Sequence, residues 1–391
     1  MKAPLQNHYT VPDTLKKFIK ENSIAVRSPG RINLIGEHLD YNDGYVLPAA
    51  IDKAAYIVIT PRTDRNIHLH SVDMNDSFDT SLDNITISKK SWPNYLLGVV
   101  DQFLKAGIEL PGFDAALTGD IPLGAGLSSS AAVECAMALA LNELSNAGFD
   151  KLAMVQKAQK AEHEFAGVQC GIMDQFASVF GKKDHVIKLD CHSLQYEYEP
   201  LKLDGYKIVL FDSNVKHSLA SSEYNVRRKQ CEDGVAIVQQ YHPEIKSLRT
   251  VTIEMLDEHV LPKDAVIYNR CKYVVEEIQR LLGGCKDLEA NDIKAFGKKM
   301  YATHHGLSDL YEVSCSELDF LVAQVENGDA VIGARMMGGG FGGCTINIVK
   351  EEAVDELINK VSTAFKSQLN QELKAYIVNI EDGSSVLDIT A

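Results

Sequence analysis

The chain has little positive charge, a single tryptophan and no long apolar run. It carries 39 Lys and Arg against 54 Asp and Glu, which gives a formal net charge of −15. This balance opposes non-specific binding to nucleic acid or to anionic membrane surfaces. No segment approaches the length of a membrane-spanning helix, and the first residues lack the apolar stretch of a signal peptide. We therefore expect a cytoplasmic protein that binds a small molecule, with no nucleic-acid or membrane partner.

Several well-known motifs are also absent. The eight cysteines form no C-x-x-C pair and no Cys/His spacing typical of zinc, so we expect reduced, mostly buried thiols. The sequence contains no G-x-x-x-x-G-K-[ST], H-R-D or D-F-G motif, which disfavours P-loop enzymes and protein kinases. An acidic chain that binds a nucleotide must therefore hold its phosphates with backbone amides, a helix N-terminus and a metal ion.

Strand and helix patterns alternate along the chain, which predicts an α+β fold. Alternating or apolar runs predict strands at 54–62, 66–72, 206–213 and 344–349. Helical patterns occupy 129–146, 151–166, 223–241 and 266–282. Asp150 is suited to cap the second of these helices and Gly167 to end it. The length predicts two domains, 1–200 and 201–391, divided at the turn EPLKLDG.

The segment VRSPGRINLIGEHLDYNDGYVLP, residues 26–48, concentrates polar side chains between apolar stretches. Arg31, Glu37, His38 and Asp40 fall within ten residues. A polar hairpin on the surface would account for any one of them alone. As a group they favour recognition of a polyol, because short acidic and amide-type side chains fix hydrogen bonds to hydroxyls in set directions.

The segment IPLGAGLSSSAAVECA, residues 121–136, runs from a Gly and Ser loop into an apolar helix. Gly124 and Gly126 allow the backbone to approach an anion, and the helix start offers free amides and a favourable dipole. The hydroxyl of Ser130 could bind a magnesium ion that is held by phosphate. The alternative is a serine cluster that only caps the helix.

The segment RMMGGGFGGC, residues 335–344, is rich in glycine and indicates that backbone passes close to a ligand or to another segment, although a flexible loop is the alternative. It also matches G-x-G-x-x-G through Gly338, Gly340 and Gly343. A dinucleotide fingerprint needs a strand before it and a helix after it. Here a helix-like stretch precedes and a strand pattern follows, so a dehydrogenase is disfavoured.

Three further segments, 91–95, 161–181 and 217–232, join these motifs in an order that resembles the GHMP kinase family, most closely its galactose-phosphorylating members. The resemblance covers about residues 20 to 350. It implies a two-domain GHMP kinase fold with the active site between the domains. It also implies Mg²⁺-dependent transfer of the γ-phosphoryl group of ATP to the C1 hydroxyl of α-D-galactose, which gives galactose 1-phosphate and ADP.

The same resemblance assigns roles to individual residues. The catalytic carboxylate falls on Asp174 and its partner arginine on Arg31, while Ser130 and Glu162 fall on the magnesium positions. The sugar-binding positions are Glu37, His38, Asp40, Gly171, Asp174 and Tyr224. The nucleotide-binding positions are Gly124, Ala125, Gly126, Leu127, Ser128, Ser129, Ser130 and, near the adenine, Trp92.

Three residues depart from the family pattern: Leu39 and Met337 stand where Thr is usual, and Pro93 interrupts the W-x-N-Y segment. Two alternatives therefore stay open beside phosphorylation of galactose. One is a sugar 1-kinase of the same family that acts on N-acetylgalactosamine or another sugar. The other is a non-catalytic sensor that binds galactose and ATP to regulate a protein partner.

Overall fold

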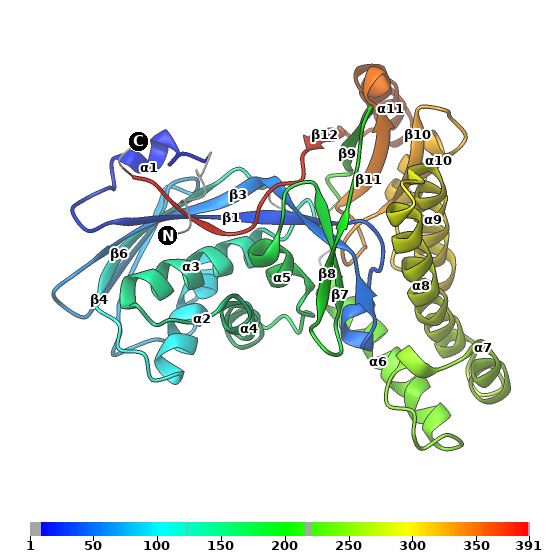
Figure 1. Ribbon diagram of the computed structural model, residues 1–391, viewed down its shortest axis with the longest axis horizontal. Helices are drawn as coiled ribbons and strands as arrows, with labels where there is room; N and C mark the ends of the chain where they lie inside the picture. Colours follow the sequence, from blue (N-terminus) through cyan, green and yellow to red (C-terminus); the bar gives the residue numbers. More distant parts are fainter. Residues whose placement is uncertain (1–8, 123, 216–219, 390–391) are drawn as a thin grey trace.

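The computed structural model describes residues 9–122, 124–215 and 220–389, and within them the fold is built on three sheets flanked by helices (Figure 1). The sheets have six, four and three strands. Their orders are β13-β1-β3-β6-β4-β5, β10-β11-β9-β12 and β2-β7-β8. The predicted α+β class is confirmed.

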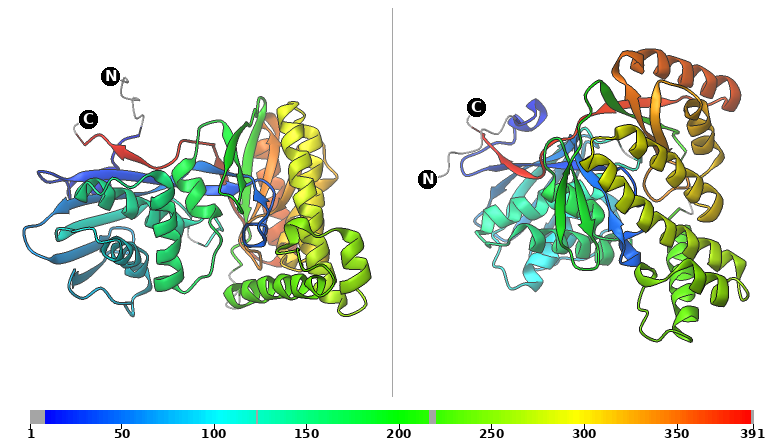
Figure 2. Two further views of the ribbon diagram at one scale, coloured as in Figure 1. Left: turned by 60° about the horizontal axis from the view of Figure 1, so that its bottom comes forward. Right: turned by 45° about the vertical axis from the view of Figure 1, so that its right-hand side comes forward.

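The six-stranded sheet belongs mainly to the first part of the chain. Its strands are β1 (Ile24–Asn33), β3 (Pro48–Pro61), β4 (Asn66–Ser71), β5 (Asp76–Ser81), β6 (Phe113–Gly119) and β13 (Ser385–Leu387). β4 runs parallel to β6, and the other neighbours are antiparallel. The end of the chain thus returns to the first sheet, where Leu387 lies opposite Ala25 (Figure 2).

Helices α2 (Ser91–Lys105), α3 (Ser129–Ser145), α4 (Lys151–Ala161) and α5 (Met173–Phe180) cover one face of this sheet, and α1 (Asp13–Lys16) lies on the other (Figure 1). α3 is apolar around most of its surface because it lies between the sheet and the helices α2 and α4. As predicted, Asp150 caps α4 by accepting from the Ala153 amide at 2.8 Å. α4 continues as a π-helical turn, η2 (Glu162–Ala166), which ends at Gly167 with φ 75°.

The four-stranded sheet consists of β9 (Tyr206–Asp212), β10 (Val331–Met336), β11 (Cys344–Lys350) and β12 (Lys374–Val378). β10 corrects an expectation, because a strand and not a helix precedes the glycine-rich segment. The short segment 331–336, VIGARM, is ambiguous by itself, and its antiparallel pairing with β11 decides the outcome. A strand still follows the glycines, so the fingerprint of a dinucleotide site stays incomplete.

The remaining helices all follow β9 in the sequence. They are α6 (Ala220–Gln239), α7 (Ile253–Met255), α8 (Ala265–Glu289), α9 (Ile293–His305), α10 (Ser316–Glu326) and α11 (Val354–Leu369). α9 crosses β10 so closely that a Cβ at Gly297 would lie 2.1 Å from the carbonyl oxygen of Ile332. α10 and α11 pack on the sheet through Leu321 and Phe365, which meet Phe211 of β9.

The three-stranded sheet, β2 (Tyr45–Val46), β7 (His185–Asp190) and β8 (Tyr196–Pro200), lies between the two larger sheets (Figure 1). The largest apolar core joins both parts of the chain, from Ile32 of β1 through Phe176 of α5 to Ile346 of β11. This shared core fixes the ends of β1, α5 and β10 relative to one another. Within the described ranges, no helix is long and apolar enough to cross a bilayer.

Candidate active site

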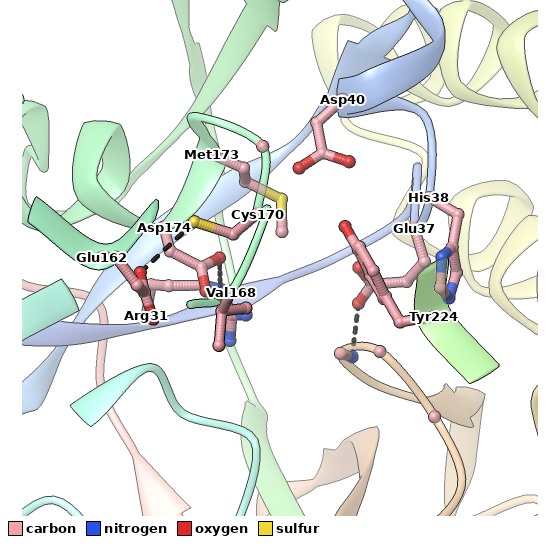
Figure 3. A pocket seen from close by; sticks show the side chains of 14 residues that line it. Arg31, Glu37, His38, Asp40, Glu162, Val168, Cys170, Met173, Asp174 and Tyr224 are labelled. Atoms are coloured by element: carbon pink, nitrogen blue, oxygen red, sulfur yellow. Dashed lines mark hydrogen bonds and ion pairs between the residues drawn. The ribbon is translucent and has the colours of Figure 1, made fainter. Parts of the chain in front are cut away.

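A cavity of about 250 Å³ lies where β1, α5, α6 and the glycine-rich segment meet (Figure 3). Its lining brings together segments that lie far apart in the sequence. The lining residues are Arg31, Glu37, His38, Asp40, Glu162, Val168, Cys170, Gly171, Met173, Asp174, Tyr224, Gly338, Gly339 and Gly340. All of the predicted catalytic and sugar-binding residues are therefore in one cavity, together with Glu162.

Arg31 and Asp174 form a two-point ion pair in this cavity. Arg31 Nε donates to Asp174 Oδ1 at 2.7 Å, and Nη2 donates to Oδ2 at 3.0 Å. Arg31 Nη1 donates to the Gly126 carbonyl at 2.5 Å, so β1 also holds the loop before α3. The hydroxyl of Ser128 donates to Asp174 Oδ2 at 2.5 Å. These contacts fix the carboxylate of Asp174 in one orientation.

Ser128 bears on the alternative in which the serine cluster only caps the helix. Its side chain is at the N-cap position of α3 but makes no capping hydrogen bond. Ser128 has φ 57°, which turns its hydroxyl away from the helix amides and toward Asp174. The Ser128 hydroxyl therefore does not occupy the first amides of α3.

Glu37 is almost fully buried and joins β1 to the glycine-rich segment. Its Oε1 accepts from the Gly338 amide at 2.7 Å and from Arg335 Nη2 at 3.1 Å. Burial opposes ionisation of Glu37, but the charges of Arg335 and Arg31 hold its pKa below the usual value. Arg335 also donates to the carbonyl oxygens of Leu34 and Asn33. Sequence reasoning missed Arg335, although it is the only charged residue of the motif RMMGGGFGGC.

The glycine-rich segment passes very close to other backbone, as one of its two interpretations predicted. A Cβ at Gly340 would lie 2.1 Å from the Val313 carbonyl oxygen, and one at Gly342 would lie 2.3 Å from that of Val215. Both glycines also have positive φ, 85° and 133°. Side chains are therefore excluded there, and Gly338 can present its amide to Glu37.

His38 lies in an aromatic cluster at the other end of the cavity. Its Nδ1 shares a hydrogen bond of 2.7 Å with the hydroxyl of Tyr41, which in turn bonds Tyr311. Its ring centroid lies 5.3 Å from that of Tyr224. Burial lowers the pKa of His38 to about 4, so the imidazole is neutral at neutral pH. Nε2 is buried and has no hydrogen-bond partner among the described residues.

Asp40 and Gly171 are in tight contact across the cavity. A Cβ at Gly171 would lie 1.8 Å from Asp40 Oδ2, so only glycine fits at this position. Burial, together with the charges of Asp174 and Glu37, raises the pKa of Asp40 to about 7. Near neutral pH the carboxyl group of Asp40 can thus accept a hydrogen bond from a ligand hydroxyl when it is ionised and donate one when it is protonated.

Ser130 and Glu162, the two predicted metal ligands, lie next to each other. Ser130 Oγ donates to Glu162 Oε1 at 3.0 Å. Glu162 is buried, and burial followed by the charge of Asp174 raises its pKa. Cys170, which sequence reasoning did not single out, donates its thiol to Glu162 Oε2 at 3.3 Å. Within the described ranges, no group of three or more His, Cys, Asp or Glu side chains is arranged to hold a metal ion.

A second cavity of about 310 Å³ opens beside the start of α3. Trp92, Ser129 and Ser130 line it, together with Ala55, Ser71, Asp73, Met74, Tyr95, Leu117, Thr118, Gly119, Ile121 and Val133. The indole Nε1 of Trp92 donates to Asp76 Oδ2 at 2.9 Å, which orients the ring. Pro93 lies in the first turn of α2, where a missing amide hydrogen is harmless.

The rest of the predicted nucleotide-binding loop lies outside both cavity linings. The side chains of Ala125 and Leu127 are buried in the core, and Gly124 and Gly126 have φ values of 80° and 75°. Leu39 and Met337, which depart from the family pattern, are also buried and absent from both linings.

Comparison with known proteins agrees with this geometry. The galactokinase galactose-binding signature matches residues 15–61, and the GHMP kinases N terminal domain and the GHMP kinases C terminal match 94–182 and 285–367. A galactokinase of Clostridium beijerinckii is 42% identical over 377 residues, which are 95% of this chain and 97% of that protein. This chain belongs to the galactokinases of the GHMP kinase family.

Other galactokinases match as fully. The protein of Thermotoga maritima is 42% identical over 360 residues, which are 92% of this chain and 99% of its own length. The crystal structure of Lactococcus lactis galactokinase complexed with galactose superposes with a TM-score of 0.89 at 34% identity, covering 93% of this chain and 95% of that one. The GHMP kinase fold expected from the sequence is thus confirmed.

Proposed function

We propose that this chain is a galactokinase that transfers the γ-phosphoryl group of ATP to the C1 hydroxyl of α-D-galactose. The two-point ion pair of Arg31 with Asp174 carries the proposal, because it places a fixed carboxylate in a cavity lined with polar groups suited to a sugar. Galactose in the matched Lactococcus lactis structure supports the choice of acceptor. Galactose would then enter carbohydrate metabolism as galactose 1-phosphate.

The sugar would lie in the 250 Å³ cavity. Hydrogen-bonding groups for its hydroxyls would come from the side chains of His38, Asp40 and Glu37, which line the cavity. Tyr224 closes one side with its ring, and Gly171 keeps the space that Asp40 needs. Hydroxyl groups removed from water require such paired partners, which is how a site of this kind distinguishes one sugar from another.

The chemistry follows from the position of Asp174. Its carboxylate would accept the C1 hydroxyl proton as the C1 oxygen attacks the γ-phosphorus and the bond to the β,γ-bridging oxygen of ATP breaks, releasing ADP. Arg31 orients the carboxylate of Asp174 through two hydrogen bonds and would stabilise the negative charge near the γ-phosphate. ATP would extend from this point along the start of α3 into the second cavity, where Trp92 would lie near the adenine.

The residues at the start of α3 also fit a magnesium ion. The Ser130 hydroxyl and the Glu162 carboxylate are hard oxygen ligands, and phosphate oxygens and water would complete the set. Burial and the neighbouring acidic groups raise the pKa of Glu162 and of Glu134, and a cation beside Ser130 would stabilise the ionised form of Glu162. Bound Mg²⁺ would neutralise charge on the phosphates of ATP.

The proposal includes the organisation of the chain. We place the domain division near residue 200, with the sugar cavity lined from both sides, by Arg31 and Asp174 and by Tyr224 and Gly338. The last strand, β13, would then belong to the first domain, because it pairs with β1. We assign the protein to the cytoplasm, in keeping with the free thiols of its eight cysteines.

The direct test is ADP release from Mg-ATP with galactose, glucose, N-acetylgalactosamine, arabinose and mevalonate, each measured against a control without acceptor. We expect turnover with galactose and its close analogues, and galactose 1-phosphate as the product. Strong preference for N-acetylgalactosamine or another sugar would refute the substrate assignment while keeping the mechanism. Binding of galactose and ATP without turnover would refute the proposed kinase activity and favour a non-catalytic sensor.

A further inference from the structure

Gln175 directly follows Asp174 in α5, and its side chain is completely buried. Its amide nitrogen Nε2 donates to Glu162 Oε2 at 2.7 Å and to Glu134 Oε2 at 3.2 Å. An amide nitrogen has two hydrogens, so both are directed at carboxylates. Gln175 therefore bridges two acidic side chains that come from different helical elements, η2 and α3.

Glu134 is also completely buried, one turn beyond Ser130 in α3. Its Oε1 has no hydrogen-bond partner among the described residues, and the same holds for Gln175 Oε1. A buried carboxyl group with an unpartnered oxygen is costly to stability, and a simple packing role would be served better by an apolar side chain. The contact with Gln175 is therefore the feature that would explain why a buried carboxyl group is kept at Glu134.

The bridge controls the orientation of Glu162. Gln175 and the thiol of Cys170 hold Oε2, so Oε1 remains directed at Ser130. Without the bridge, only the thiol of Cys170 would oppose rotation of the Glu162 carboxylate on the Oε2 side. Because Asp174 and Gln175 are adjacent, the same turn of α5 fixes both the carboxylate paired with Arg31 and the one beside Ser130.

We infer that Gln175 and Glu134 are positioning residues for the divalent cation, and that they hold Glu162 in the orientation that binds it. This inference rests on the proposed role of Ser130 and Glu162. Groups that orient a metal ligand typically contribute 10- to 100-fold to metal affinity. Neither Gln175 nor Glu134 lines the sugar cavity or the second cavity, so their effect on substrates is indirect.

The test measures binding and needs no turnover. The affinity for the non-hydrolysable analogue adenylyl imidodiphosphate is determined by calorimetry for the full chain, once with Mg²⁺ and once with EDTA. Gln175→Met keeps the volume of the side chain and removes both donated hydrogen bonds. We expect it to weaken binding about 10- to 100-fold with Mg²⁺ and to leave binding in EDTA unchanged.

Gln102→Met is a matched control. Gln102 is also buried, and its Nε2 also donates to two carboxylates, Glu164 Oε2 at 2.9 Å and Asp101 Oδ2 at 3.2 Å. Glu164 belongs to the same turn, η2, as Glu162. Gln102→Met should leave the Mg²⁺-dependent gain in affinity unchanged, whereas an equal loss in both variants would overturn the inference in favour of a general effect on η2.

Two further variants separate the possible failures. Glu162→Ala must remove the Mg²⁺-dependent gain, and if it does not, the proposed metal ligand is wrong. If Glu162→Ala removes the gain and Gln175→Met keeps it, only the bridge is refuted. Should Gln175→Met not fold, Glu134→Met tests the bridge from the other side and should weaken Mg²⁺-dependent binding. Glu134→Gln should recover most of that loss because it keeps an acceptor oxygen, and equal affinity in both Glu134 variants would overturn the inference.

Discussion

Arg31 and Asp174 are 143 positions apart in the sequence, and they meet with both Asp174 carboxylate oxygens engaged by one guanidinium group, at 2.7 and 3.0 Å. Arg31 is almost fully buried in β1, whereas Asp174 reaches the cavity from α5. A buried arginine supplies a fixed charge and a fixed direction to its partner. The pair therefore defines where a hydroxyl group can approach the carboxylate.

Asp174→Asn should lower kcat by roughly 10²- to 10⁴-fold, the usual contribution of a general base. The amide keeps the shape of the side chain but cannot accept the C1 hydroxyl proton. Affinity for Mg-ATP should stay close to wild type, because Asp174 acts on the sugar. Initial rates and nucleotide titrations on the same preparation check both parts, and retained turnover would remove Asp174 from the mechanism.

Ser128→Ala separates the two roles that the serine cluster could have. Because the Ser128 hydroxyl donates to Asp174, its loss should lower kcat several-fold and change the affinity for ATP little. Ser130→Ala should instead weaken binding of Mg-ATP, since Ser130 lines the second cavity beside Glu162. Measuring kcat and ATP affinity for both variants decides this. A Ser128→Ala variant whose only defect is ATP affinity would contradict the position of this hydroxyl.

Much of the site was predictable because its residues lie within compact sequence motifs, while the partners that orient them are set by the tertiary fold. Asp174, Arg31 and Glu162 could be assigned from the segments that resemble GHMP kinases. The contact of Ser128 with Asp174 was not predicted, because the left-handed backbone conformation of Ser128 depends on the packing of the loop beneath β1. Pairing between residues 143 positions apart leaves no local pattern.

The fold shows the same division. Segments with strong periodicity, such as β9 and α4, appear where the sequence predicted them. The stretch before the glycines was expected to be helical, but β10 is only six residues long and its pairing with β11 stabilises it as a strand. Arg335 was overlooked for a related reason, since its partners, the Leu34 and Asn33 carbonyls, are about 300 positions away.

Gly171→Ala should raise the KM for galactose by about tenfold or more, the effect of one lost hydrogen bond to a charged group. The new Cβ would overlap Asp40 Oδ2, so the carboxyl group must move away from the sugar. Gly328→Ala is the control, because the new Cβ would have an ordinary contact of 3.6 Å in a turn outside the site. Steady-state kinetics with both variants check this, and an unchanged KM in Gly171→Ala would refute the role of Asp40.

The kcat/KM for galactose should fall as the pH drops through about 7. Burial and the charges of Asp174 and Glu37 raise the pKa of Asp40 to about 7, and protonation removes an acceptor for a sugar hydroxyl. His38 does not titrate in this range, since burial lowers its pKa to about 4. A pH profile of kcat/KM for wild type and for Asp40→Asn checks the assignment, because the variant should lose this inflection.

Asp40 also predicts how stability depends on pH in the absence of sugar. Between about pH 4 and pH 7 the folded protein holds a proton on Asp40 that the unfolded chain has lost. The stabilising contribution of Asp40 to the free energy of unfolding is thus complete below about pH 4, and it is lost as the pH rises through 7. Asp40→Asn should raise the unfolding temperature more at pH 8 than at pH 5. A larger increase in unfolding temperature at pH 5 than at pH 8 would show that ionisation of Asp40 costs the folded protein little free energy.

The fluorescence of Trp92 can report nucleotide binding, because Trp92 is the only tryptophan of the chain and lines the second cavity with Ser129 and Ser130. Stacking of adenine near the indole should change its fluorescence when ATP is added, whereas galactose alone should leave the signal unchanged. Trp92→Phe should abolish the signal while it keeps an aromatic side chain in place. If galactose alone gave the full change, or if saturating ATP gave none, the adenine could not lie beside Trp92 and the second cavity would lose its assignment.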